Sequence, residues 1–269
     1  MAARKTKHAM IGAALLAVAW PAATLAQGFA ALVSPPRFEV SAKPGERIRE
    51  VMEITNASAQ AAKYRLRTAD WTLEENAAVK FDDALLPGSC RPWVAIEGRQ
   101  ITVSPGGKYR YRFEVAPPAD APAGECRFAL LIEGDEQNVT TAGGPSFPIQ
   151  GRLGVIVYVT IGDAAPKLEV VEARVAAVNG EPTPVLMVKN TGNAHGRLMG
   201  FLSGTDAEGK KLEFNTATLP ILPGETRAIS LALYREREDQ AIKIAYPITI
   251  RGKLEWGGKT TPFEQSFSR

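Results

Sequence analysis

The side chains that most often carry out chemistry in proteins are few and scattered in this sequence. His195 is the only histidine outside the first 26 residues, and a lone histidine in a turn has no companion ligands for a metal. The acidic pairs Asp82-Asp83 and Asp135-Glu136 fall in turn-like segments, where carboxylates usually face solvent. GxSxG, GxGxxG, Walker and CxxC motifs are all absent from the sequence. The sequence therefore predicts a binding protein without a catalytic residue, a metal or a cofactor.

Two cysteines, Cys90 and Cys126, are present in the chain. An oxidising compartment favours joining them, and two small buried thiols are the alternative. In the chain-entropy model, closing a loop of about 36 residues stabilises a fold by roughly 3–4 kcal/mol. We expect a structural disulfide rather than a redox site.

The first 26 residues have the three parts of a secretory signal peptide. Basic residues come first, an apolar run follows from Ala9 to Trp20, and small residues end at Ala26. The apolar run is short for a bilayer, and no later run approaches the roughly 18 apolar residues of a membrane helix. We expect cleavage before Gln27 and an exported mature protein with no membrane span.

Charge and composition exclude two further classes of protein. With 45% hydrophobic and 23% charged residues, the composition is that of a folded globular chain. The leader holds three of the 32 Lys and Arg residues and no acidic residue, so 29 basic and 29 acidic side chains remain after it. A nucleic-acid-binding protein needs a surplus of basic residues, so nucleic acid is not an expected partner.

Past the leader, apolar residues alternate with polar ones in short runs, which is the period of half-buried β-strands. Four such runs are residues 49–55, 63–68, 109–115 and 228–233. Pro, Gly and Asn predict turns at residues 43–46, 104–107, 190–193 and 222–225. Short strands separated by turns, with almost no helical periodicity, predict an all-β protein built from antiparallel sandwiches.

A weak internal repeat indicates the number of domains. Residues 51–56 (VMEITN) resemble residues 186–190 (LMVKN), and a Pro-Gly turn followed by an alternating strand comes after each copy. We therefore expect two tandem immunoglobulin-like β-sandwiches after a signal peptide of residues 1–26. The first spans residues 27–162 and the second spans residues 163–269, with a turn-rich junction so short that it implies a fixed angle between them.

Four segments of the first predicted domain occur in a characteristic order. They are LVSPPRFEV (32–40), ITVSPG (101–106), RFALLIE (127–133) and RLGVIVYV (152–159). In this order, behind a signal peptide, they resemble the periplasmic pilus-assembly chaperones of the PapD-like family. The match covers residues 28–162 and is only architectural in the second domain. The cysteine pair and a short Gly-rich loop before Phe147 are typical of a distant branch rather than of the central members.

The resemblance implies a periplasmic chaperone that caps pilus or fimbria-like subunits and delivers them for assembly, with an outer-membrane usher as a further partner. In this family the chaperone lends an edge strand to an incomplete subunit sandwich, so that main-chain bonds give affinity and alternate side chains fill pockets. The matching segment is 138–159. Its predicted donor residues, which share one face of a strand, are Phe147, Ile149, Leu153, Val155 and Val157. For residues 155–159 a buried strand of the protein's own core is an equal alternative, because both faces are apolar.

The family also anchors the subunit's terminal carboxylate between its two domains with two basic residues. Arg37 matches the first by its place on the opening strand, and a guanidinium can hold a carboxylate through two parallel hydrogen bonds. The family's second basic residue, a lysine, would fall near Val155, so the sequence departs from the pattern there. The nearest basic residue, Arg152, is the predicted second anchor. For each arginine an ordinary surface charge is the alternative.

Two other classes of function stay open at the level of the sequence. One is a structural or adhesive two-sandwich protein of the cell surface or of a pilus tip. The other is a carbohydrate-binding or hydrolase sandwich, which needs paired carboxylates or an exposed aromatic platform. Trp71, Trp93 and Trp256 are available, but each lies in a strand-like context that is typical of core residues.

Overall fold

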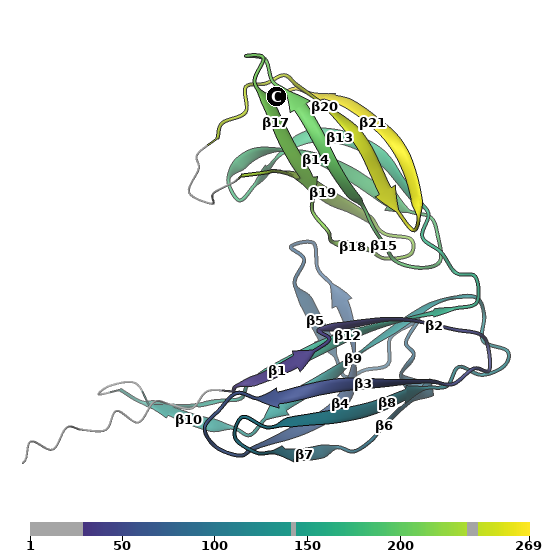
Figure 1. The fold of residues 1–269 in the computed structure, drawn as a ribbon, viewed down its shortest axis with the longest axis vertical. Helices are drawn as coiled ribbons and strands as arrows, with labels where there is room; N and C mark the ends of the chain where they lie inside the picture. The colour runs from purple at the N-terminus through teal and green to yellow at the C-terminus, as the bar shows by residue number, and fades with distance from the viewer. Residues whose placement is uncertain (1–28, 141–143, 236–241) are drawn as a thin grey trace, which may run out of the picture.

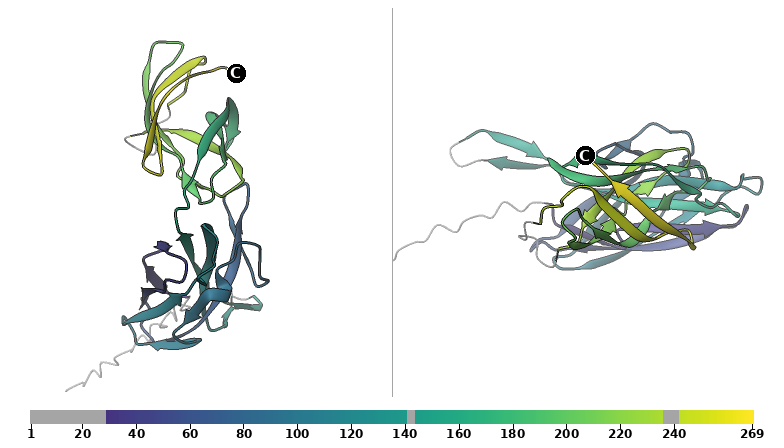
Figure 2. Two further views of the ribbon diagram at one scale, coloured as in Figure 1. Left: turned by 90° about the vertical axis from the view of Figure 1, so that its right-hand side faces the viewer. Right: turned by 90° about the horizontal axis from the view of Figure 1, so that it is seen from above.

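The computed structural model describes residues 29–140, 144–235 and 242–269, which form two β-sandwiches stacked along the long axis of the molecule (Figure 1, Figure 2). The predicted signal peptide, residues 1–26, lies outside the described residues. Within these ranges the only helix is the short 3-10 turn η1 (Arg91–Trp93), so no described helix is long enough to cross a membrane. The predicted all-β class is confirmed.

The first sandwich consists of two sheets and a projecting hairpin. One sheet has the order β1-β3-β8-β6, with bounds Ala31–Ser34, Ile48–Asn56, Lys108–Val115 and Val94–Ile96. The other has the order β2-β12-β9-β4-β5, with bounds Arg37–Ala42, Arg152–Ile161, Gly124–Gly134, Ala62–Leu73 and Val79–Asp82, and β7 (Gln100–Val103) also pairs with β4. The hairpin is formed by β10 (Gln137–Thr140) and β11 (Ser146–Ile149).

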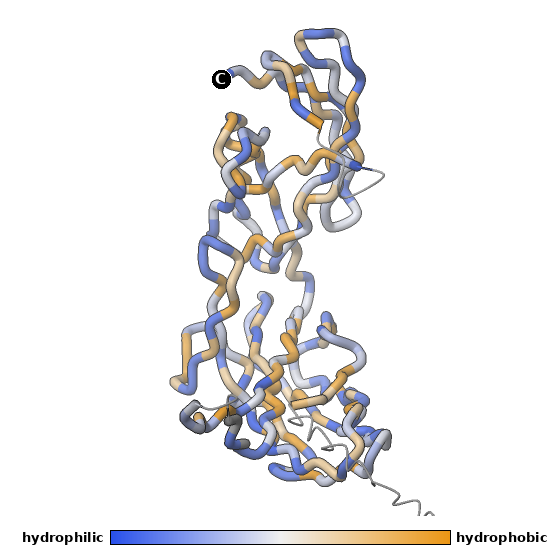
Figure 3. Tube along the Cα trace, turned by 90° about the vertical axis from the view of Figure 1, so that its left-hand side faces the viewer, coloured by the Kyte–Doolittle hydropathy of each residue, from blue (hydrophilic) through white to orange (hydrophobic). Residues whose placement is uncertain are grey.

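Alternation along each strand directs one face of each sheet inward. In β8, Tyr111, Phe113 and Val115 are buried, whereas Arg112 between them is exposed. Figure 3 shows the same exchange of hydrophobic and hydrophilic residues along the strands of both sandwiches. The inward faces of the two sheets meet in one apolar core, as expected for a sandwich. Burial of these side chains is the main favourable contribution to folding.

The second sandwich follows one continuous strand order, β13-β14-β19-β17-β16-β20-β21. Their bounds are Leu168–Val178, Glu181–Asn190, Thr226–Leu233, Lys211–Thr216, Met199–Thr205, Ile248–Trp256 and Lys259–Phe267. Residues 226–230 of β19 pair with β14 and residues 231–233 pair with β17, so this strand passes from one layer to the other. A small separate ladder joins β15 (Gly196–Arg197) to β18 (Pro220–Ile221).

The internal repeat corresponds to a repeated hydrogen-bond pattern around a buried asparagine. Asn56, at the end of β3, donates through Nδ2 to the main-chain oxygen of Val103 at 3.1 Å. Asn190, at the end of β14, donates through Nδ2 to the main-chain oxygen of Ile221 at 2.8 Å. Each acceptor stands two residues before the proline of a Pro-Gly turn. The two sandwiches therefore fix the same turn to the same strand end, and each asparagine is buried with its amide satisfied.

The two cysteines are joined. The Sγ atoms of Cys90 and Cys126 are 2.08 Å apart, across a sequence separation of 36 residues. Both cysteines are buried, and the bond ties the segment before η1 to β9 in the middle of a sheet. The predicted disulfide is confirmed as a structural link.

Side chains from both sandwiches meet between them. Leu222, in the turn before β19, packs in one apolar cluster with Tyr158 of β12. The β4–β5 hairpin rises toward the second sandwich (Figure 1), where Arg227 donates through Nη1 to the main-chain oxygen of Glu74 at 3.0 Å and through Nη2 to that of Leu73 at 3.2 Å. Because Arg227 is itself buried, these bonds hold the hairpin firmly against the second sandwich.

Candidate functional site

Strand β12 is only partly covered on its outer edge. On one side β9 pairs with β12 along its whole length. On the other side the parallel strand β2 begins with Arg37, opposite Ile156, so residues 152–155 have no strand paired there within the described part of the chain. Main-chain groups along that stretch can pair with an added strand.

The hairpin of β10 and β11 continues this edge beyond the sandwich. Among the described residues β11 pairs only with β10, and both views show the hairpin projecting from the first sandwich (Figure 1, Figure 2). The register shifts by one residue between the β9–β12 and β10–β11 pairs, which places a β-bulge at residues 134–136. We name the outer side of residues 146–155 the open edge.

Alternate side chains along the open edge and the strand that follows it change from exposed to buried. Phe147 and Ile149 are 52% and 54% exposed. Leu153 is half-buried and packs against the first core, and Val155 and Val157 are fully buried within it. We name these five residues the donor row, because they are the residues that the sequence predicts to be donated.

The structure divides the donor row into two groups. Phe147 and Ile149 present their side chains to solvent, as a binding role requires. Val155 and Val157 are core residues of the protein's own sandwich, and Val157 has paired strands on both sides. For these two valines the structure favours the alternative of a buried core strand, because the facing sheet covers both side chains and β2 also pairs with the strand at Val157.

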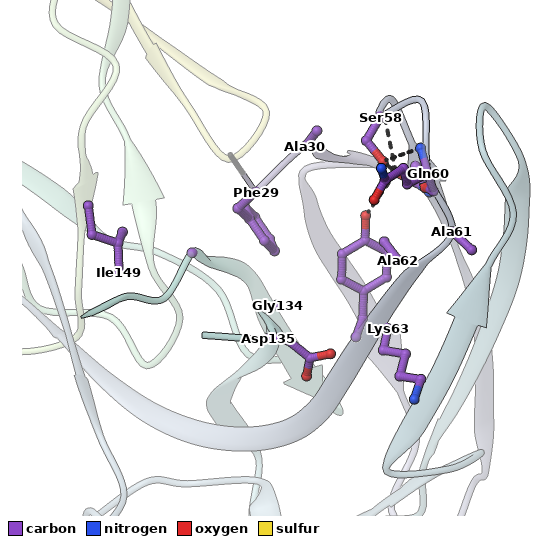
Figure 4. A pocket seen from close by; sticks show the side chains of 13 residues that line it. Phe29, Ala30, Ser58, Gln60, Ala61, Ala62, Lys63, Gly134, Asp135 and Ile149 are labelled. Atoms are coloured by element: carbon purple, nitrogen blue, oxygen red, sulfur yellow. Dashed lines mark hydrogen bonds between the residues drawn. The ribbon is translucent and has the colours of Figure 1, made fainter. Parts of the chain in front are cut away.

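A pocket of about 190 Å³ opens where the donor row leaves the core (Figure 4). Its walls come from Phe29 at the start of the described chain, from the turn between β3 and β4, and from Gly134 and Ile149. The ring of Phe29 packs edge to face on Tyr64, with ring centroids 5.9 Å apart. Sequence reasoning did not identify Phe29, because it stands near the predicted cleavage site without the periodic neighbours that mark a strand face.

Three basic side chains converge on one carboxylate oxygen between the two sandwiches. From Oε1 of Glu39, Nε of Arg37 lies 2.7 Å away, Nη2 of Arg197 lies 3.5 Å away and Nε2 of His195 lies 3.6 Å away. Arg37 and Glu39 belong to β2 of the first sandwich, whereas His195 and Arg197 belong to the second. The side chains of Arg37 and Glu39 are 49% and 46% exposed, so this interdomain cluster is open to solvent.

His195 lies in the interface between the sandwiches rather than in solvent. Its side chain is 9% exposed, and its Nδ1 lies 2.5 Å from Oε2 of the buried Glu125. The imidazole stacks on the ring of Tyr158, with centroids 3.8 Å apart. Burial raises the pKa of Tyr158 to about 12. A lone histidine in a turn is usually solvated, but His195 is buried because the turn that carries it is covered by the first sandwich.

Arg152 does not lie close to Arg37 in the fold. Along β12, Arg152 lies four residues from Ile156, the residue opposite Arg37, which is roughly 13 Å at the rise of a β-strand. Its Nε lies 2.8 Å from Oε1 of Glu133, and Arg67 also binds that oxygen. The side chain beside Arg37 is Arg197, which sequence reasoning missed because nothing local relates the turn of one domain to the first strand of another.

The other classes of function find little support in the described residues. Within them, no three His, Cys, Asp or Glu side chains are grouped to bind a metal ion. Trp71 is buried, and Trp93 and Trp256 are half-buried and pack against the cores of different sandwiches. These three tryptophans therefore do not form the exposed aromatic platform of a carbohydrate-binding sandwich.

No protein-family model and no curated protein matches the sequence. Many solved structures are similar in fold and cover nearly the whole chain. The class 5 fimbriae chaperone CfaA has a TM-score of 0.47 and 11% identity, over 89% of this chain and 99% of that one. The E. coli chaperone DraB has a TM-score of 0.46 and 13% identity, over 89% and 97% of the two chains. The Salmonella enterica SafA pilin in complex with the SafB chaperone has a TM-score of 0.47 and 12% identity, over 89% and 97%. At these identities each likeness is one of fold.

Proposed function

We propose that this protein is a periplasmic chaperone that binds incompletely folded β-sandwich subunits of a pilus or fimbria-like fibre and delivers them for assembly. The subunit pairs an edge strand with the open edge, while Phe147, Ile149 and Leu153 enter its exposed apolar groove. Burial of apolar surface drives this association, so the chaperone needs neither ATP nor a metal. An outer-membrane usher is the proposed recipient of the complex.

The change from buried to exposed side chains along the donor row is the main support for this proposal. Side chains on one face of the strand continue from a closed core at Val157 to solvent at Phe147, and the outer side of residues 146–155 lacks a paired strand in the described part of the chain. Proteins usually protect such an edge with charge or with a covering element. A large aliphatic and a large aromatic side chain at the exposed end instead favour a partner that completes the core.

Arg37 is the proposed anchor for the subunit's terminal carboxylate. Glu39 indicates that this position accepts a carboxylate, because Arg37 and Arg197 both face its Oε1. Nη2 of Arg197 faces this oxygen at 3.5 Å, so a carboxylate at the same position would meet two guanidinium groups. The predicted role of Arg152 as the second anchor stays a prediction. The geometry does not support it, since Glu133 already neutralises Arg152.

The test is capture of a subunit by the exported, tagged full chain. Co-expression with small exported β-proteins encoded beside it, followed by mass spectrometry of the purified complex, should identify a bound subunit. The double substitution Phe147→Ser with Ile149→Ser should reduce capture about tenfold or more, because exposed aromatic and aliphatic anchors dominate binding energy. The melting temperature should change little, since both side chains are more than half exposed.

A matched control is available on the second sandwich. Met199 and Phe201 also stand two residues apart on one strand, β16, and are 50% and 62% exposed. Their substitution by serine should leave capture unchanged. Equal capture by all three proteins would contradict the proposal, and a large loss of melting temperature in the Phe147/Ile149 variant would place those residues in a core instead.

A further inference from the structure

The donor row has a gap at Gly151, and Phe29 fills it. A Cβ on Gly151 would lie 2.0 Å from Cβ and 2.2 Å from Cγ of Phe29. A Cβ on Gly134, on the facing strand, would lie 2.8 Å from Cδ2 of the same ring. Neither glycine has a left-handed backbone, so the side chain of Phe29, and not the chain conformation, is what excludes a side chain at both positions.

We infer that Phe29 is part of the binding surface, where it takes the place of the side chain that Gly151 lacks. We further infer that the pocket beside Phe29 receives one bulky apolar side chain of the partner strand. This inference rests on the proposed function. The surface presented to the partner is then composite, with Phe147 and Ile149 from the hairpin, Phe29 from the start of the mature chain and Leu153 from β12.

The size of the pocket suits one large side chain. A cavity of roughly 150 Å³ is enough for a benzene-sized ring, and this pocket measures about 190 Å³. Figure 4 shows Phe29 and Ile149 on one side of the pocket and Gln60 and Lys63 on the other side. A phenylalanine or leucine of the partner would therefore contact the Phe29 ring directly.

The buried amide in the wall, that of Asn56, is already satisfied within the chain. Asn56 donates through Nδ2 to the main-chain oxygens of Gln60 at 2.7 Å and Val103 at 3.1 Å. Its Oδ1 accepts from the main-chain N–H of Ser58 at 3.0 Å. An apolar side chain can therefore enter without leaving a buried amide unpaired, which would otherwise oppose binding.

Phe29 is held by a different part of the chain from the donor row. The main-chain N–H of Ala57 donates to the oxygen of Ala30 at 2.8 Å, and the ladder of β1 with β3 starts at Ala31 opposite Asn56. The ring is thus positioned by the segment that leads into β1, and we expect its removal to leave the β10–β11 hairpin intact, because these two strands pair with each other. Phe29 and the hairpin residues can therefore be tested separately.

The probe is a synthetic peptide of roughly ten residues, long enough to pair along residues 146–155, with alternating Val and Thr, a central Phe and a free carboxylate. A second peptide carries Ala at the central position. Binding of both is measured by isothermal titration calorimetry to the mature full chain and to its variants. Phe29→Ala should weaken the Phe peptide about tenfold and should remove most of the preference for Phe over Ala. Phe201→Ala, at an exposed phenylalanine of the second sandwich, is the control and should change neither affinity.

A stability cycle tests the geometry without any ligand. Gly151→Leu alone should lower the melting temperature by several degrees, because the new side chain meets the Phe29 ring. In the Phe29→Gly background, which also removes the Cβ that would stand 2.0 Å away, the same substitution should cost much less, and it should restore part of the peptide affinity. Two outcomes would overturn this inference and leave the proposed function in place. The first is an equal loss of melting temperature from Gly151→Leu in both backgrounds. The second is unchanged peptide affinity in Phe29→Ala while Phe147→Ser with Ile149→Ser abolishes binding. Absence of peptide binding to the unaltered chain, or binding that is indifferent to Phe147 and Ile149, would instead overturn the proposed function and this inference with it.

Discussion

Glu39 brings the basic side chains of the interdomain cluster to one oxygen. Its Oε1 is shared by Arg37, Arg197 and His195, which come from two sandwiches and meet only in the folded chain. Because Glu39 is 46% exposed, a carboxylate from outside can compete with it for the same guanidinium groups. The energetic contribution of each exposed ion pair here is small, since solvent screens it.

Arg37→Ala should weaken binding of a peptide with a free terminal carboxylate about tenfold, because a hydrogen bond to a charged group contributes about 1.5–3 kcal/mol. The same peptide with an amidated terminus should bind the unaltered protein and the variant equally. Glu39→Gln, which removes the internal competitor, should favour the free carboxylate over the amide more strongly than the unaltered chain does. Titration calorimetry with both peptides measures all three effects. An equal loss of both peptides on Arg37→Ala would argue against a carboxylate anchor.

At the scale of elements, β12 performs two roles along its length. From Ile156 onward it is an interior strand between β2 and β9, and before Ile156 it is an edge. The change occurs because β2 starts only at Arg37, after the chain has crossed from the first sheet of the sandwich to the second. The segment before β1 places Phe29 beside the edge that β2 leaves open.

The disulfide stabilises the sheet that carries this edge. Reduction of Cys90–Cys126 should lower the free energy of unfolding by roughly 3–4 kcal/mol, because the closed loop spans 36 residues. Urea unfolding with and without dithiothreitol measures the difference. The Cys90→Ser/Cys126→Ser variant is the control, and it should be insensitive to the reductant. An unchanged unfolding midpoint on reduction would contradict a stabilising role.

At the scale of the molecule, the two sandwiches meet through a mixed interface. Tyr158 lies at its centre, packed in one cluster with Leu222 and stacked on His195. The β4–β5 hairpin adds a second contact through Arg227. Together these contacts bring Arg37 and Arg197 to the same oxygen, so the relative placement of the sandwiches determines the geometry of the proposed anchor.

Alkaline pH should loosen this interface. The pKa of Tyr158 is raised by burial from 10.0 to about 12, so the folded protein holds the phenolic proton more tightly than the unfolded chain does. The associated stability is fully present below about pH 10 and is lost as the pH rises from 10 toward 12. Melting temperatures recorded across that range should fall several degrees less for Tyr158→Phe than for the unaltered protein. Parallel curves would show that the burial of this hydroxyl does not contribute.

The segment that carries Phe147 and Ile149 was predicted from a family resemblance. Local patterns in the sequence were sufficient for the strands, the turns and the repeat around Asn56 and Asn190. These features depend on period-two alternation and on turn residues, which act over a few positions. The tertiary structure alone decided that Val155 and Val157 are covered, that Phe29 lies over Gly151 and that Arg197 rather than Arg152 stands beside Arg37. Each of these depends on which distant strands lie next to each other, and the alternation within one strand is the same whether or not another strand covers it.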